Sequence, residues 1–145
     1  MNRHLAEWES EAVRLMNKGK LKDAIELFEK VINERPDFEH GMEFYHLAGC
    51  YEDLGDLEKA EQNYLKALSY GPGDTIRMGG YAAFLYLHGD PEKSFEMHLK
   101  LLSDPTFAEG AITSLKALGT RLGLTEEQVR QKIEAAKSNH KIRTD

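Results

Sequence analysis

Few residues of this chain have the types and spacing that chemistry requires, and the best candidates lie in one stretch. Glu43 and His46 stand three positions apart, which would place a carboxylate and an imidazole on one helix face as metal ligands. A di-metal bundle needs a second such pair and more carboxylates, which the sequence does not contain. We therefore interpret Glu43 and His46 as a surface polar pair. Cys50 has no basic pair nearby to lower its pKa, so we expect a small packed hydrophobe rather than a nucleophile.

Other catalytic motifs are absent from the sequence. Gly71-Pro72-Gly73 has neither the spacing nor the Lys-Ser/Thr pair of a phosphate-binding loop. There is no nucleophile elbow, and the six histidines are scattered without paired metal spacing. We therefore predict no catalytic residue, no metal site and no cofactor, and we expect that the protein is not an enzyme.

One C-terminal segment has features of a DNA-binding motif. Residues 123–133 resemble the turn and second helix of a DNA-binding helix-turn-helix, with Arg130 and Lys132 facing outward. The spacing is degenerate, because any tightly turned helical pair needs a glycine and similar apolar residues. Glu126 and Glu127 would also meet phosphates and base edges unfavourably. DNA binding is thus the minor alternative.

Charge is unevenly distributed along the 145 residues. The net charge is −6, made up of −9 over residues 1–115 and +3 over residues 116–145. An acidic body repels phosphate, which disfavours general binding to nucleic acid or to anionic membranes. We interpret the basic end as a solvated terminus.

Composition indicates a soluble globular chain in a reducing compartment. Hydrophobic residues make up 41% of the chain and charged residues 30%, and the single cysteine excludes an internal disulfide. No apolar run approaches the roughly 20 residues needed to span a bilayer. The first residues are acidic where a signal peptide would need an apolar core. We therefore predict a cytoplasmic protein.

The elements that must position any site repeat along the chain. The pattern is clearest in residues 51–72, where a Leu-Gly-Asp break is followed by an apolar face at helical spacing, made by Leu57, Ala60, Tyr64, Ala67 and Leu68. Equivalent positions recur at intervals of 36 and then 34 residues. These sets are Gly19, Gly55 and Gly89; Ala24, Ala60 and Ser94; Phe28, Tyr64 and His98; and Trp8, Phe44 and Met78.

A period near 34 with this small-large pattern resembles the tetratricopeptide repeat. The resemblance implies an all-α fold, a right-handed α-solenoid of about three helix-turn-helix repeats in one domain over residues 1–145. The repeats would span about 5–38, 41–74 and 75–105, followed by a capping helical hairpin over about 106–139 and a frayed tail at 140–145. Glu11, Ser94 and His98 depart from the family pattern.

Local signals predict how these helices begin and end. Gly19 can adopt the left-handed conformation that ends a helix. Residues 37–40 form an enlarged loop, with Phe38 against the core. Gly79-Gly80 indicates close helix packing, a late-starting helix, or a partner that approaches the backbone. Residues 125–128 form a capping box.

The family resemblance also implies a protein-binding groove lined by the first helix of each repeat. A clamp for a chaperone carboxylate is missing, because its positions hold Glu9, Val13, His46, Ile76 and Gly80. Apolar and acidic residues instead suit a peptide or protein segment with aliphatic and basic side chains. The predicted groove residues are Glu9, Val13, Met16, Asn17, Met42, Tyr45, Glu52, Asp53, Ile76 and Tyr86.

Three functions remain open from the sequence. The first is a non-catalytic adaptor or scaffold that binds a partner segment in the groove. The second is a dedicated chaperone, similar in size to the three-repeat chaperones of type III secretion. In the third, the groove is filled by the protein's own last helix or by a second copy, so that the repeats assemble a homodimer.

Overall fold

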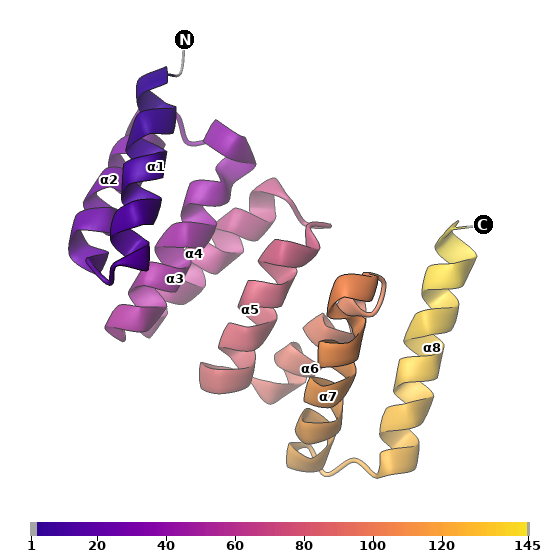
Figure 1. The fold of residues 1–145 in the computed structure, drawn as a ribbon. Helices are drawn as coiled ribbons and strands as arrows, with labels where there is room; N and C mark the ends of the chain where they lie inside the picture. The colour runs from indigo at the N-terminus through magenta and orange to yellow at the C-terminus, as the bar shows by residue number, and fades with distance from the viewer. Residues whose placement is uncertain (1–2, 145) are drawn as a thin grey trace. The chain divides into compact units, whose positions relative to one another are not determined.

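The computed structural model describes residues 3–144, and the side chains as far as Asn139. Within this range the fold is all-α, and consecutive helices pack in pairs (Figure 1). The prediction of an all-α fold built from paired helices is therefore confirmed. The α-helices are α1 (Arg3–Asn17), α2 (Leu21–Glu34), α3 (Met42–Leu54), α4 (Leu57–Tyr70), α5 (Thr75–His88), α6 (Pro91–Leu101), α7 (Pro105–Arg121) and α8 (Glu126–Thr144), with a 3-10 helix η1 (Phe38–Gly41) between α2 and α3.

The chain divides into two compact units, Met1–Arg77 and Met78–Asp145, and the division falls within α5. Each predicted repeat span, and the predicted capping hairpin, contains all or most of two helices. The single domain, the repeat boundaries and the solenoid stay predictions. One boundary differs, since α8 continues to Thr144 across residues expected to form a tail.

Side-chain caps explain where several helices begin. Asp56 accepts a hydrogen bond from the Lys59 backbone at the start of α4, and Asp90 and Asp104 accept equivalent bonds at the starts of α6 and α7. At α8, the Gln128 backbone N–H donates to the Thr125 hydroxyl at 3.1 Å, and the Thr125 N–H donates to the Gln128 side chain at 2.8 Å. The predicted capping box is confirmed, and it satisfies amide groups that a helix start leaves without partners.

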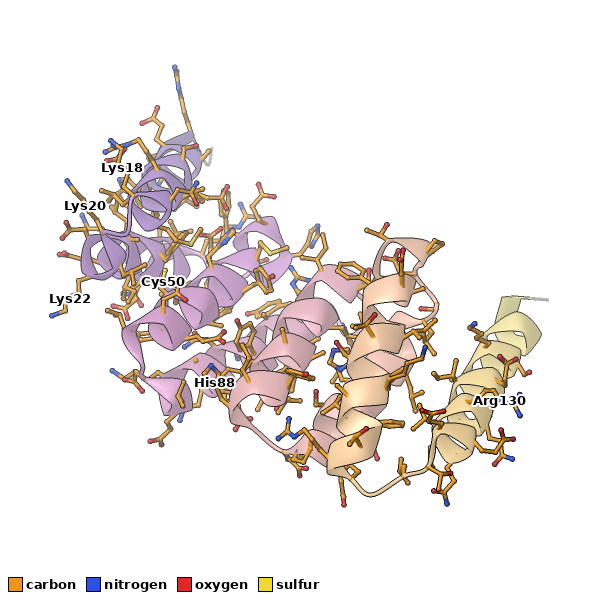
Figure 2. The ribbon with its side chains drawn as sticks, turned by 60° about the horizontal axis from the view of Figure 1, so that its bottom comes forward. Lys18, Lys20, Lys22, Cys50, His88 and Arg130 are labelled. Atoms are coloured by element: carbon orange, nitrogen blue, oxygen red, sulfur yellow. The ribbon has the colours of Figure 1, made fainter. Side chains whose placement is uncertain are left out.

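The turn between α1 and α2 is closed by Gly19. Its φ of +78° lies in the left-handed region, as predicted, and the Lys20 N–H donates to the Leu15 carbonyl at 2.9 Å. This bond satisfies a carbonyl in the last turn of α1 and reverses the chain tightly. Figure 2 shows Lys18, Lys20 and Lys22 pointing away from the ribbon around this turn.

The core of the first unit lies between α1, α2 and α3. Ala12, Ala24 and Phe28 are fully buried, and the small alanines allow the helices to approach closely. Cys50 is also buried, which confirms the expectation of a packed small residue. Two buried clusters lie in this unit, one of Ala12, Ala24, Ile25, Phe28, Leu47 and Cys50 and one of Leu5, Val31 and Phe38.

The predicted apolar face of α4 is mostly confirmed. Ala60 and Ala67 have no exposed surface. Tyr64, which lies between them in the sequence, is also buried. Leu57 was expected on the same face but is 38% exposed, so that assignment is wrong. Leu57 is the first residue of α4, where a helical face has no preceding turn to cover it.

The expected loop at residues 37–40 is a strained turn. Phe38 is buried, as predicted, and it is the first residue of the 3-10 helix η1. Glu39 and His40 have φ of 50° and 53°, a conformation that costs about 1–3 kcal/mol for residues other than glycine. The Arg77 guanidinium donates a 2.7 Å hydrogen bond to the His40 carbonyl, which helps to hold the turn.

In the second unit, Gly79 permits close packing. A Cβ at this position would lie 3.1 Å from the Phe107 ring of α7, so a larger side chain would push the ring away. The alternative of a late-starting helix is wrong, because α5 begins at Thr75.

Ser94 and His98, the two α6 residues that depart from the family pattern, are both buried. The Ser94 hydroxyl donates a hydrogen bond to the Ala82 carbonyl at 3.1 Å. The buried apolar positions of α7 and α8 include Ala111, Leu115, Leu118, Val129 and Ile133.

Candidate functional site

Most of the predicted groove residues lie on α1 and α3, which are in contact within the first unit. We call this set the α1–α3 surface. It presents partly exposed apolar side chains together with acidic ones. Its members are Glu9, Val13, Met16, Asn17, Met42, Tyr45, Glu52 and Asp53, of which Asn17 and Asp53 are exposed and the others half-buried.

Tyr45 is the aromatic residue of the α1–α3 surface. Its ring is half-buried and makes edge contacts with the Tyr64 ring at 6.1 Å and the His46 ring at 6.0 Å between centroids. Burial raises the pKa of its hydroxyl, and the negative charges of Asp74 and Glu52 add to this. The hydroxyl therefore stays protonated and can donate a hydrogen bond to a ligand.

The acidic edge of the surface consists of Glu52 and Asp53. Glu52 is half-buried and accepts a 2.7 Å hydrogen bond from the Tyr64 hydroxyl. Asp53 projects into solvent. Glu52 is therefore held in position and its negative charge acts on Tyr45, whereas the neighbouring Asp53 exposes its charge to solvent.

Val13 and Met16 on α1 have two roles. Both are half-buried and pack against the core cluster that contains Ala12 and Phe28. Part of each side chain supports the fold, and the remainder faces solvent. Methionine has a flexible stem and a polarisable sulfur, so Met16 can adapt its exposed part to different contacts.

The two remaining predicted residues lie on α5. Ile76 is 50% exposed, which is unusual for a large aliphatic side chain. Tyr86 belongs to the second unit and is half-buried there, where the Arg121 guanidinium lies 5.8 Å above its ring and donates to its carbonyl at 3.1 Å. Their membership of one groove with the α1–α3 surface stays a prediction.

Glu43 differs most from its predicted role. We expected a surface polar pair with His46, but Glu43 has no exposed surface and no described residue donates a hydrogen bond to either of its carboxylate oxygens. Burial raises the pKa of its carboxyl well above the ordinary range; the Glu9 carboxylate, which can accept a hydrogen bond from the protonated form, and the negative charges of Glu9 and Glu39 raise it further. Glu43 is therefore a buried acid that holds a proton at neutral pH.

A sequence signal could have identified this buried acid. Glu43 stands four positions before the apolar Leu47 and seven before Cys50, which was expected to be packed. These intervals place all three residues on the same side of α3, so its spacing indicated burial even though its residue type did not. Arg77, which is also buried and pairs with Asp74 at 3.5 Å, was not identified as a structural residue either.

The groups with the potential for chemistry are unsuited to it. Burial raises the pKa of the Cys50 thiol to about 11, so little thiolate exists at neutral pH. The His46 ring stacks on Phe28 at 5.2 Å, and burial lowers its pKa, so it is neutral. No group of three or more histidine, cysteine or acidic side chains is placed to hold a metal ion in the part of the chain that the structure describes.

The second unit has an apolar cleft between α7 and α8, with a volume of about 460 Å³. Arg130 lies at its edge, on α8 (Figure 2), and is paired with Glu127 through two hydrogen bonds. This exposed pair places a negative charge beside a side chain that the helix-turn-helix alternative needs for phosphate contact. The cleft is lined by Ile112, Lys116, Thr120, Leu124, Glu126, Val129, Arg130 and Ile133.

Paired helices with small residues at their contacts define a helical repeat protein. Residues 44–73, which contain α4 and most of α3, match the family model described as the tetratricopeptide repeat. The chain therefore contains a tetratricopeptide repeat over these residues, as the sequence predicted, and a repeat of this family implies a protein–protein interaction module. The family match falls on the helix pair that contains Tyr45, Glu52 and Tyr64.

The chain is also similar to a chloroplast protein of the plant Arabidopsis thaliana. The two are 27% identical over 116 residues, which cover 74% of this chain and 32% of the relative. The chain therefore spans about a third of that relative's length. The relative's name places it in the chloroplast, so it does not support the predicted cytoplasmic location, which stays a prediction.

Among the helices described here, none is long and apolar enough to cross a membrane.

Proposed function

We propose that the protein is a non-catalytic adaptor that binds a segment of a partner protein on its α1–α3 surface. The observation that carries this proposal is the position of Tyr45, a half-exposed aromatic side chain on the first helix of the matched repeat, close enough to the acid Glu52 for its charge to act on the hydroxyl. Tyrosine combines a large contact area with a hydrogen-bonding tip and is enriched among residues that dominate binding energies.

The neighbouring side chains define the chemistry of the partner segment. Met16 and Met42 are half-buried and offer adaptable apolar contacts on either side of the α1–α3 contact. Glu52 and Asp53 supply negative charge that favours basic residues. The partner segment would therefore carry aliphatic anchors with lysine or arginine nearby. Ile76 and Tyr86 are proposed as further contacts with the partner segment.

The test compares two tyrosines on the same helix. A partner captured with the wild-type protein is titrated against Tyr45→Ala, which should weaken its affinity by about 1–2 kcal/mol. Tyr51→Ala is the matched control, because Tyr51 is also half-buried on α3 but donates to Glu29 of α2 at 2.9 Å. The control should lower the melting temperature and leave the affinity unchanged.

A charge variant tests the acidic edge. Asp53→Lys reverses an exposed charge without removing the hydrogen bond between Tyr64 and Glu52. We expect a slower association rate at low salt, with the difference narrowing as salt is added, because exposed charges act mainly by steering.

Solution mass separates the adaptor from the self-association alternative. If a second copy covers the α1–α3 surface, Tyr45→Ala will dissociate a dimer. An unchanged affinity, melting temperature and mass in Tyr45→Ala would show that this surface is not the binding site.

A further inference from the structure

Three carboxylates meet at the contact between α1, η1 and α3 without a compensating cation. Glu43 of α3 is fully buried, and no described residue donates a hydrogen bond to either of its oxygens; the Glu9 carboxylate can only accept one from the protonated Glu43. The charged groups that act on it are Glu9 of α1 and Glu39 of η1, both acids. The structure records no ion pair for Glu9 or Glu39 in its described part. A buried polar group without a partner requires a physical explanation.

A proton accounts for this arrangement in the free protein. Like charges this close cannot all be ionised in a site of low dielectric constant, so the most buried carboxyl remains neutral. His46 faces Glu9 from α3, but burial lowers the pKa of its ring, so the imidazole is uncharged and supplies no compensation. Glu9 is half-buried, so it interacts with Glu43 while remaining partly accessible itself.

We propose that Glu9 and Glu43 are the recognition site for a lysine or arginine side chain of the partner, which replaces the proton held in the free protein. This inference rests on the proposed function, since it assigns the basic residue of the bound segment to a place beside α1. Glu9 makes the direct contact, and Glu43 is the buried group that ionises behind it.

The exchange is balanced in charge and in protons. In the free protein one of the two carboxyls is protonated and the other is ionised, giving a charge of −1. In the complex both are ionised beside one cation, which again gives −1, and the proton passes to the buffer. Charge complementarity selects a cation, and a neutral side chain of the same length has no means of displacing the proton.

The exchange makes binding depend on pH. Because the pKa of the Glu43 carboxyl is raised, the free protein carries the proton across neutral pH, and binding must release it. Affinity therefore rises with pH, by up to about tenfold for each unit, until the free protein loses the proton unaided.

The experiment uses single amino-acid probes, so it does not depend on knowing the partner. Nα-acetyl-lysine amide and Nα-acetyl-arginine amide are titrated into the full chain at pH 6, 7 and 8, with backbone amide shifts of Glu9 and Glu43 followed by NMR. Nα-acetyl-norleucine amide, which lacks the charge, is the matched probe. We expect saturable shifts with the cationic probes that strengthen with pH, and none with norleucine.

Two variants and a control identify the residues. Glu9→Gln should abolish saturable binding, because it removes the direct contact. Glu43→Gln mimics the protonated acid, so it should weaken binding at pH 8 several-fold and remove its pH dependence. Glu58→Gln changes an exposed acid on α4 and should behave as wild type. Circular dichroism verifies that each variant is folded.

Equal amide shifts with the lysine and norleucine probes would show that Glu9 and Glu43 do not recognise a cation. Lysine binding that needs Glu9 but shows no pH dependence, or that survives unchanged in Glu43→Gln, would overturn the proton exchange. Failure here is distinct from failure of the proposed function: a partner that binds through Tyr45 but is indifferent to Glu9→Gln would refute this inference alone.

Discussion

The Tyr64 hydroxyl on α4 donates a 2.7 Å hydrogen bond to the Glu52 carboxylate on α3. Tyr64 is only 6% exposed, so the bond is partly shielded from water. Burial raises the pKa of Tyr64 well above its ordinary value, and Glu52 contributes to the shift, so the hydroxyl remains a donor. The same contact thus joins two helices of the matched repeat and positions an acid on the α1–α3 surface.

Removing this hydroxyl should destabilise the fold. In Tyr64→Phe, we expect the free energy of unfolding to fall by about 1.5–3 kcal/mol, the range for a hydrogen bond to a charged group. Urea denaturation measures the change. Tyr51→Phe removes the more exposed bond to Glu29 and should cost less. Equal losses in the two variants would show that shielding of the Tyr64 bond has no effect on its strength.

Overpacking α4 should also destabilise the protein. Ala60 has no exposed surface, so Ala60→Leu adds volume where none is free and should cost about 1–3 kcal/mol. Gln62→Leu adds a leucine to the exposed side of the same helix and should leave the thermal midpoint nearly unchanged. An unchanged midpoint in Ala60→Leu would contradict the close packing of α4.

Glu43 should make stability fall as pH rises. The folded-state pKa of its carboxyl is raised above the unfolded value, so its contribution is fully present below the ordinary glutamate pKa of about 4.3 and is lost towards alkaline pH. Glu43→Gln, which cannot ionise, should match wild type near pH 4 and exceed its stability increasingly from pH 5 to 8. The difference can reach about 1.4 kcal/mol for each pH unit.

Denaturation of wild type and Glu43→Gln at several pH values provides the measurement. Glu58→Gln is the control, because an exposed acid should give a constant difference from wild type. A difference between wild type and Glu43→Gln that does not vary with pH would mean that the carboxyl is already ionised in the folded protein.

Deleting residues 106–145 should expose the apolar surface that α7 covers on α6. Buried Leu115 and Leu118 lie on α7, and buried Phe95 and Leu101 lie on α6, with which α7 is in contact. The truncated protein should aggregate or bind a hydrophobic dye. A soluble truncated form, together with a duplex-DNA shift by full-length protein that Arg130→Ala and Lys132→Ala abolish, would favour the DNA-binding alternative.

Much of the fold could be predicted because its signals are local. The left-handed Gly19 and the Thr125–Gln128 capping box depend on residues within one or two turns, so residue types in order are enough to predict them. The spacing of Ala60, Tyr64 and Ala67 predicts a buried face because helical periodicity places them on one side. The family resemblance rests on this same periodicity.

The candidate site was predictable only in part. The sequence placed Met16, Met42 and Tyr45 on the first helices of repeats, and the structure shows them half-buried there. Whether those side chains contact a ligand depends on what packs against their exposed face. The helical spacing of the sequence does not determine this. The bond from Tyr64 to Glu52 joins residues twelve positions apart across a turn, so its geometry depends on how two helices pack.

By itself, the sequence determined an all-α chain of paired helices, the ends of several of them, and the resemblance to the tetratricopeptide repeat. Only the tertiary structure decided that Glu43 is buried among acids and that Arg77 reaches the His40 carbonyl across 37 positions. The physical reason is that helix formation and capping depend on neighbours in sequence. The charge state of a carboxyl depends instead on the solvent and charges brought around it by distant segments.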